Sequence, residues 1–145
     1  MSLDGVYASD NVFARILRGE IPKAVIFEDE QTMAFMDAFP QSPGHALVIH
    51  KFSTARNLLD AEPEVLATLI VTVQKIARAA RAALKPDGLV VTQFNGEAAG
   101  QTVYHLHFHI IPRWVGADLG RHGAGVADPV ELRRLAALIA SNIKK

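Results

Sequence analysis

Hydrophobic positions recur along this chain with two different periods, and each period predicts a different kind of element. Between residues 63 and 84 the apolar side chains fall three or four positions apart, as they do on one broad face of a helix. Asp60 precedes this stretch and Pro63 can occupy a first turn, so we predict the longest helix over residues 63–84. Its apolar face consists of Val65, Leu66, Leu69, Ile70, Val73, Ile76, Ala77, Ala80 and Leu84.

Shorter apolar stretches between turn-forming residues are typical of strands, and they lie at residues 24–28, 32–37, 45–50 and 89–94. Two further helices are predicted from their boundaries: Asp10 can cap one over residues 11–18, and Asp128 with Pro129 opens one that ends near residue 143. Strands with hairpin-like connections, mixed with helices, favour an α+β fold with an antiparallel sheet.

Residues 105 to 109 read His-Leu-His-Phe-His, an alternation that fits a strand and not a helix. His105, His107 and His109 would then share one face, while Leu106, Phe108 and Ile110 would be buried on the other. Pro112 lacks an amide donor and is expected to mark where the ladder stops.

Three imidazoles on one face have more than one interpretation. In a purely structural role, each buried ring would need partners for both nitrogens. A metal site would use two of the rings, because the first and third lie about 13 Å apart on a strand; His45, His50 or Asp37 could complete it. Without metal, one ring can attack phosphorus as a nucleophile while its neighbours donate N–H groups to phosphate oxygens.

The residues around this strand carry a family resemblance. The segment 100–113, from Gly100 through the alternating histidines to Pro112 and Arg113, resembles the signature of the histidine triad (HIT) nucleotide hydrolases and transferases. Segments of the N-terminal half are similar to the Hint-like branch and its bacterial members; they lie at residues 13–22, 27–30, 34–37 and 43–49.

The resemblance implies a role for each matching residue. His107 corresponds to the nucleophile that becomes nucleotidylated. The other implied catalytic residues are His105, which helps to position the nucleophile partly through its backbone carbonyl, His109, and His45 near the nucleophile. It also implies phosphate contacts at Asn95, Gln101, Thr102 and His109, a ribose contact at Asp37, and a base slot formed by Phe13, Ile16, Ile21, Phe35 and Leu47.

Several of these residues have a plain structural interpretation as well. Most of the residues of the proposed base slot would be core in any globular domain. Asp37 can start a turn, Asn95-Gly96 is a turn signal by itself, and His45 can simply open a strand. His50 stands where the family usually has proline, and either a surface imidazole or a contact at the pocket rim would fit.

The implied protein is a five-stranded antiparallel sheet with packed helices, assembled as a two-fold homodimer. The implied reaction is cleavage of a purine nucleoside phosphoramidate or dinucleoside polyphosphate at the α-phosphate, with release of a nucleoside monophosphate and with no metal ion at the triad. The alternatives are a nucleotide-binding regulatory protein and a nucleotidyl transferase. Residues 100–103 and 111–113 resemble the dinucleoside-polyphosphate hydrolase branch as well, so the leaving group stays open.

Composition fits a small enzyme acting on a small molecule. Fifteen basic and fifteen acidic residues cancel, which gives no sign of a nucleic-acid or membrane partner. Without a cysteine, thiolate zinc motifs are excluded. No apolar stretch approaches the ~20 residues that span a bilayer, so we expect a cytoplasmic protein.

The expected organisation is one domain on length alone. We expect a loose tail at residues 1–9, a catalytic part at 10–115, and a Gly-rich loop with a helix at 116–145 that belong to the same domain. The loop at 116–125 could be a lid, a rim or a plain solvent-exposed connection.

Overall fold

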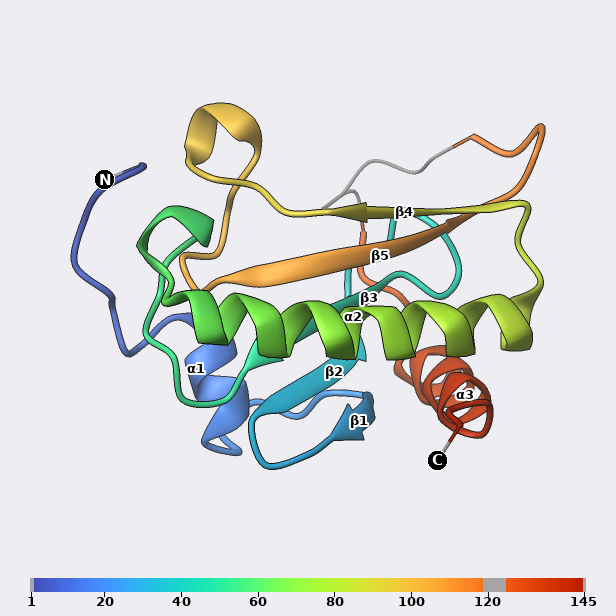
Figure 1. Ribbon diagram of the computed structural model, residues 1–145. Helices are drawn as coiled ribbons and strands as arrows, with labels where there is room; N and C mark the ends of the chain where they lie inside the picture. Colours follow the sequence, from blue (N-terminus) through green and yellow to red (C-terminus); the bar gives the residue numbers. More distant parts are fainter. Residues whose placement is uncertain (1, 119–124, 145) are drawn as a thin grey trace.

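Five strands form one antiparallel sheet in the order β1-β2-β3-β5-β4 in the computed structural model, which describes residues 2–118 and 125–144 (Figure 1). The five-stranded antiparallel sheet expected from the sequence is confirmed. The strands are β1 (Val25–Glu28), β2 (Thr32–Met36), β3 (Ala46–His50), β4 (Gly88–Thr92) and β5 (His107–Arg113).

The two longer helices cover the same face of the sheet. Helix α2 (Pro63–Leu84) packs on β2, β3 and β5, and α3 (Pro129–Ala140) packs on α2, β1 and β2. The main core fills this interface, with alternate strand residues such as Ala34, Val48 and Ile110 facing the helices. The C-terminal helix therefore belongs to the same domain as the sheet.

The opposite face of the sheet carries a second, smaller apolar cluster and the short helix α1 (Val12–Leu17). Met33, Phe35, Leu47 and Ile49 point to this side because side chains alternate along β2 and β3. The same alternation on β5 turns His107 and His109 away from the two long helices. The sheet thus separates the main core from the histidines.

Helix α2 has the bounds predicted from its apolar period. Pro63 lies in the first turn, where a missing N–H costs nothing, and Lys85 ends the helix in a left-handed conformation with φ of 52°. The predicted helix 11–18 is α1, but its N-cap is Asn11 and not Asp10: the Asn11 side chain accepts the Ala14 N–H at 3.0 Å.

The prediction that Pro112 ends the ladder was wrong. Pro112 lies inside β5 and pairs with Leu89 of β4. Its carbonyl oxygen accepts the Ser42 hydroxyl, on the side where β3 has already ended, since β3 pairs with β5 only up to Ala46 opposite Ile110. The N–H that proline lacks would point to that same side, so no ladder bond is lost.

The first nine residues were expected to form a loose tail, and the described ones, 2–9, have no helix or strand. They nevertheless lie against the body: the Arg56 guanidinium is within 3.4 Å of the Ser2 carbonyl oxygen, and the Glu97 N–H donates to Ser2 Oγ at 2.6 Å. Within the Gly-rich stretch 116–125, residues 119–124, including His122, lie outside the described part of the chain. Among the described residues, no helix is long and apolar enough to cross a bilayer.

Candidate functional site

Two of the three alternating histidines, His107 and His109, lie on β5; His105, expected on the same strand, lies two positions before it, because the ladder begins only at His107. The His107 and His109 rings are 5.0 Å apart between centroids. The ring of Phe13, on α1, lies edge-on to both His107 and His105, with centroids 4.9 Å and 6.2 Å away. The three rings therefore gather on one side of the sheet, beside α1, as the alternation predicted.

A pocket opens at this cluster, and it brings together six of the residues singled out from the sequence. These are Phe13, Asp37, Leu47, Thr102, His107 and His109. They come from α1, the end of β2, β3, the loop before β5 and β5 itself, so the pocket exists only in the assembled sheet. It combines an apolar wall with a carboxylate and two imidazoles, which suits a ligand that has a flat ring at one end and an anion at the other.

Hydrogen bonding fixes the tautomer of His107. Its Nδ1 lies 2.7 Å from the backbone carbonyl oxygen of His105. A carbonyl oxygen can only accept, so Nδ1 carries the hydrogen and Nε2 of the neutral ring carries the lone pair. His107 therefore has the form needed for nucleophilic attack.

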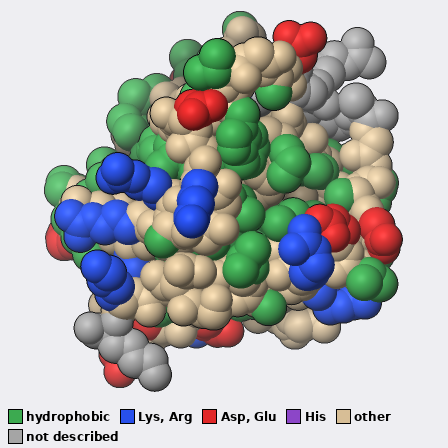
Figure 2. All heavy atoms as spheres, turned by 90° about the vertical axis from the view of Figure 1, so that its right-hand side faces the viewer, with side chains coloured by type: hydrophobic (Ala, Val, Ile, Leu, Met, Phe, Trp, Pro, Cys, Tyr) green, Lys and Arg blue, Asp and Glu red, His purple; other side chains and the backbone are tan. Residues whose placement is uncertain are grey.

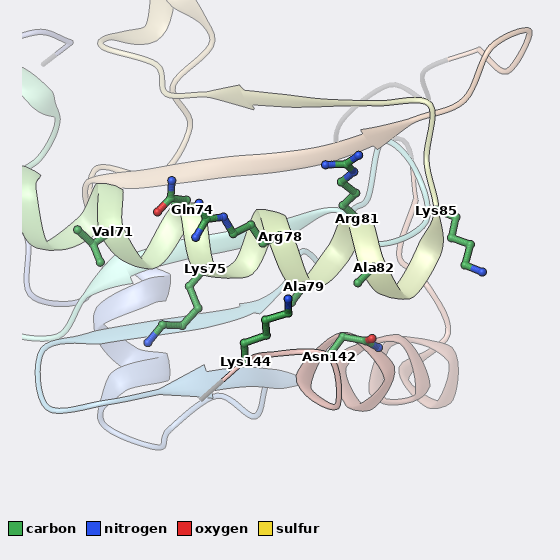
Figure 3. Close-up of a pocket in the computed structure, with 10 residues that line it drawn as sticks. All are labelled: Val71, Gln74, Lys75, Arg78, Ala79, Arg81, Ala82, Lys85, Asn142 and Lys144. Atoms are coloured by element: carbon green, nitrogen blue, oxygen red, sulfur yellow. The ribbon is translucent and has the colours of Figure 1, made fainter.

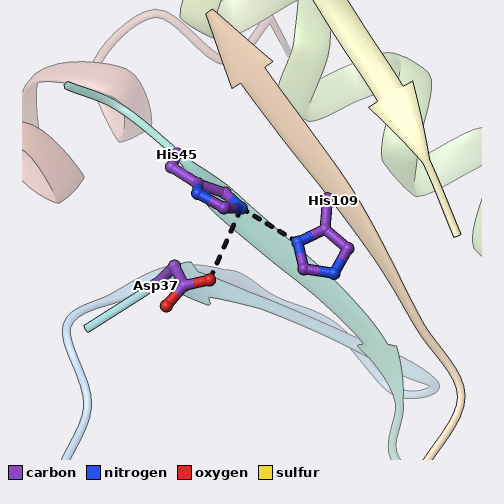
Figure 4. Close-up of side chains that lie close together, drawn as sticks. All are labelled: Asp37, His45 and His109. Atoms are coloured by element: carbon purple, nitrogen blue, oxygen red, sulfur yellow. Dashed lines mark hydrogen bonds and ion pairs between the residues drawn. The ribbon is translucent and has the colours of Figure 1, made fainter. Parts of the chain in front are cut away.

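A relay of hydrogen bonds gives His109 the opposite tautomer (Figure 4). The Gln41 N–H donates to Nδ1 of His45 at 3.0 Å, so the neutral His45 ring carries its hydrogen on Nε2. That Nε2–H lies 2.9 Å from Nδ1 of His109 and donates to it. His109 then carries its own hydrogen on Nε2, as a donor suited to an anionic oxygen.

Asp37 joins this relay from the end of β2. It is 3% exposed, its Oδ2 lies 3.4 Å from Nε2 of His45, and its Oδ1 accepts the Phe39 N–H at 2.8 Å. The bond to Phe39 is the turn-starting contact that the structural interpretation anticipated. Because Asp37 also lines the pocket, both interpretations apply to the same carboxylate.

Asp37, His45 and His109 are also spaced as a metal site would be, with one ligand atom of each within 4.8 Å of the others. A metal ion on His45 would need the lone pair of Nε2. The Gln41 N–H already occupies the lone pair of Nδ1, and a neutral imidazole has only one. The arrangement therefore matches a proton-carrying relay better than a set of metal ligands.

His105 and His45 lie behind the pocket and do not line it. His45 is fully buried, and His105 is 2% exposed. Burial lowers the pKa of His105 to about 4, so this ring is neutral at physiological pH. Both were predicted among the catalytic histidines, His105 as the residue that helps to position the nucleophile; in the structure each contacts one of the two histidines that line the pocket.

Two predicted phosphate ligands, Asn95 and Gln101, are occupied elsewhere. The Asn95 amide oxygen accepts N–H groups from Leu58 and Gln93, each at 2.9 Å, and Asn95 lines a different hollow beside residues 2–4. Gln101 is buried, and its side chain bonds to the backbone of Arg56, Gly96 and Val103. Both amides build the loop before β5. Phe94 lies beside the triad instead, with its ring 5.2 Å from that of His109.

The predicted base slot divides into a wall and a floor. Phe13 and Leu47 line the pocket, whereas Ile16 and Phe35 are buried in the apolar cluster beneath it. Ile21 is partly buried against that cluster. His50, whose role was left open, is also buried; its Nδ1 accepts the N–H groups of Phe52 and Ser53 and so caps the loop after β3.

Four further residues line the pocket that were not predicted to do so: Val12, Lys23, Phe39 and Val103. Lys23 is the notable one, because its ammonium group is half-buried near Asp37 and lies 5.5 Å from the centre of the Phe35 ring. Burial lowers the pKa of Lys23, and the nearby carboxylate of Asp37 opposes that shift. Lys23 was missed because a lysine just before a strand is no sign of a binding site. The pairing of β1 with β2 brings it near Asp37.

A second hollow lies on the outer side of α2, lined by side chains of this helix and of the chain after α3 (Figure 3). Its charged groups are Lys75, Arg78, Arg81, Lys85 and Lys144. On the face drawn in Figure 2, lysine and arginine side chains lie among apolar ones, and the described residues show no histidine. Its described lining has cations but no histidine or carboxylate to pair with them, so this hollow is a poorer candidate for catalysis than the triad pocket.

Comparison with known proteins agrees with the geometry. Residues 18–115 match the HIT domain family. A crystal structure of a Hit-like protein from Bartonella henselae superposes with a TM-score of 0.90 at 46% identity, covering 95% of this chain and 99% of that one. An adenosine 5′-monophosphoramidase of Schizosaccharomyces pombe is 35% identical over 92% of this chain and 98% of its own length. A protein of Arabidopsis thaliana named adenylylsulfatase is 37% identical over 79% of this chain and 60% of its own length.

Proposed function

Since the chain belongs to the HIT family of nucleotide-binding hydrolases and transferases, we propose that it cleaves purine nucleoside phosphoramidates, or related mixed anhydrides and dinucleoside polyphosphates, at the α-phosphate. The observation that carries this proposal is the pair of opposite tautomers on β5. His107 offers a lone pair and His109 an N–H donor within one pocket. A phosphate that accepts a hydrogen bond from His109 would lie next to the lone pair of His107.

The proposed reaction has two displacements. In the first, Nε2 of His107 attacks the α-phosphorus, a P–N bond to the ring forms, and the bond from phosphorus to the leaving group breaks. The leaving amine, phosphate or sulfate departs with the electron pair and takes up a proton where its basicity requires one. In the second, water attacks phosphorus and loses a proton to solvent, the P–N bond breaks with its electron pair returning to Nε2 of His107, and a nucleoside monophosphate leaves. Charge stabilisation by preplaced donors supplies most of the catalysis.

The remaining pocket residues suit the rest of a nucleotide. Phe13 and Leu47 would pack on the base, the Asp37 carboxylate would accept hydrogen bonds from ribose hydroxyls, and Thr102 with His109 would contact the phosphate. The names of the relatives support the choice of substrates, because a phosphoramidate and an adenylyl sulfate share the nucleoside monophosphoryl half and differ only in the leaving group.

We also propose that the reaction needs no metal ion. The relay through His45 supports this, since it supplies His109 as a donor where a cation would otherwise neutralise the phosphate. The cytoplasmic location stays a prediction from the sequence, to be checked by fractionation of cells.

Release of AMP from adenosine 5′-phosphoramidate, and in parallel from a dinucleoside polyphosphate, is the direct test. The wild-type protein should release AMP, with the same rate after treatment with a chelator. His107→Asn should reduce turnover by more than about 1000-fold while nucleotide binding persists, because only the nucleophile is lost. Binding without release in the wild type would leave a nucleotide-binding regulator, and loss of activity on chelation would favour a metal site.

A homodimer is the proposed assembly. Strand β4 is an edge of the sheet, and Val90 and Val91 on it are 37% and 45% exposed. Ile70 and Val71 on α2 are exposed as well. An edge strand with unpaired backbone groups and apolar side chains is a natural pairing surface for a second copy related by a two-fold axis.

A further inference from the structure

The N-terminal segment, residues 2–9, has one side chain that reaches the triad. Tyr7 OH lies 2.7 Å from Nδ1 of His105, and the two rings are 5.7 Å apart between centroids. The segment before Tyr7 is held against the loops that contain Arg56 and Glu97. In Figure 1 this blue segment runs past the connection between β4 and β5. Tyr7 therefore approaches His105 from a part of the chain 98 positions away.

The direction of this hydrogen bond follows from the other nitrogen of the ring. Nε2 of His105 lies 3.3 Å from the backbone carbonyl oxygen of His50, which can only accept. Nε2 therefore carries the hydrogen, Nδ1 has the lone pair, and the Tyr7 hydroxyl donates to it. Each nitrogen of this buried ring has a partner, and without Tyr7 the Nδ1 atom would lose its donor in a site that water barely reaches.

His105 in turn holds the ring of His107. The carbonyl oxygen of His105 accepts Nδ1–H of His107 at 2.7 Å, and the next amide, Leu106 N–H, donates to Ala55 at 3.0 Å. The peptide unit after His105 is thus anchored on one side by its amide and on the other by the side chain of His105. A shift of that side chain turns the carbonyl that orients His107.

We propose that Tyr7 is a positioning residue for the nucleophile, acting through the ring and carbonyl of His105. This inference rests on the proposed function, in which His107 attacks phosphorus. Tyr7 itself touches no reacting atom; its hydroxyl selects one tautomer and one orientation of His105. The segment expected to be a loose tail is, on this reasoning, a part of the active site.

Tyr7→Phe tests the proposal because it removes the hydroxyl and keeps the ring. Tyr104→Phe is the matched control, since the contact of Tyr104 with Arg56 is made by its ring, 4.5 Å from the guanidinium carbon. In the full-length protein, Tyr7→Phe should lower kcat for adenosine 5′-phosphoramidate about 3- to 10-fold, the worth of one net hydrogen bond, with KM unchanged. Tyr104→Phe should keep the wild-type kcat, KM and unfolding temperature. Tyr7→Phe should unfold a few degrees below the wild type, because Nδ1 of the buried His105 loses its donor, so kcat is compared at a temperature at which all three proteins are folded.

Nitrogen-15 NMR of the imidazoles separates positioning from a general structural effect. In Tyr7→Phe, His105 should lose its single Nε2–H tautomer, and the Nδ1–H resonance of His107 should shift or broaden. An unchanged His107 resonance, or a kcat within about twofold of the wild type, would overturn the proposal. In a His105→Gln background, Tyr7→Phe should have no further effect on kcat, and an undiminished effect there would equally contradict it.

The two proposals fail separately. If the wild-type protein released AMP from neither substrate, the proposed function would fall, and the NMR comparison alone would decide whether Tyr7 orients His105 and His107. If AMP were released and Tyr7→Phe changed neither ring, the hydrolase would stand without a role for Tyr7.

Discussion

At the scale of single residues, the site depends on which nitrogen of each histidine carries a hydrogen. The spacing of His105, His107 and His109 was enough to predict that their rings lie on one side of a sheet. Their tautomers could not be predicted, because the deciding partners are backbone groups of Gln41, His50 and His105 and the hydroxyl of Tyr7. The backbone groups leave no local sequence signal, since nearly any residue type supplies an amide or a carbonyl; only the role of the His105 carbonyl was implied, by the family resemblance. The Tyr7 hydroxyl was missed because it lies 98 positions from His105 in a segment expected to be a loose tail.

The predicted phosphate ligands also show that a residue type alone does not reveal its partner in the fold. Thr102 reaches the pocket, whereas Asn95 and Gln101 bond to their own loop and to the backbone of Leu58 and Arg56. An amide side chain near a Gly-rich turn suits an anion and a backbone group equally well. Only the folded loop decides between them.

Asp37 gives a prediction at this scale. Asp37→Ala should weaken the binding of AMP about 10- to 100-fold, because hydrogen bonds to a carboxylate are lost. It should weaken the binding of 2′,3′-dideoxy AMP far less, since that analogue has no hydroxyls to donate; calorimetry on both ligands measures the difference. Asp37→Asn is the matched variant, because an amide oxygen can still accept the Phe39 N–H. Equal losses of affinity for both ligands would contradict the proposed contact between Asp37 and the ribose.

At the scale of elements, helices were easier to predict than the strand that carries the site. Helix α2 was predicted at about residues 63–84 and has these bounds, because its apolar period is long and Pro63 marks its start. The end of β5 was missed, since proline usually interrupts a ladder and only the neighbouring strands reveal that Pro112 faces a side with no partner. The interior of a sheet depends on pairing, which lies outside any local window of sequence.

Strand β4 provides the prediction for this scale. If β4 pairs with a second copy, Val91→Lys should place a charge at that interface and convert the dimer into a monomer, as seen by light scattering after gel filtration. Val130→Lys is the control, because Val130 is 64% exposed in the first turn of α3, so a charge there is already in solvent. An unaltered mass for Val91→Lys, or a wild-type protein that is monomeric throughout, would contradict pairing through β4.

At the scale of the whole molecule, burial of histidines makes stability depend on pH. The pKa of His105 is lowered to about 4, chiefly by burial, and burial also lowers the pKa of His50. In the unfolded chain both groups bind protons near pH 6.5. Between pH 6.5 and the lower pKa of each folded-state ring, the unfolded chain binds protons that the folded protein does not. Acid therefore favours unfolding.

We expect the free energy of unfolding to be unaffected by His105 above pH 6.5 and to fall as the pH drops toward 4, by up to about 3 kcal/mol for this group. Urea unfolding at several pH values measures the slope. His105→Gln, which cannot titrate, should be less stable at neutral pH but should show a flatter dependence between pH 6.5 and 4. The same slope in both proteins would mean that other groups cause the acid sensitivity.

The pairing of β3 with β5 has a consequence for how the protein is made. One half of the sheet, β1 to β3, is a meander of neighbours in sequence, and β4 pairs with β5, the next strand along the chain. His45 and His109 meet across the seam between these halves, 64 positions apart in the chain. Closing such a long loop is slow compared with forming a hairpin. A growing chain on the ribosome can therefore form the first half of the sheet early, yet it has no relay and no pocket until β5 has emerged and docked.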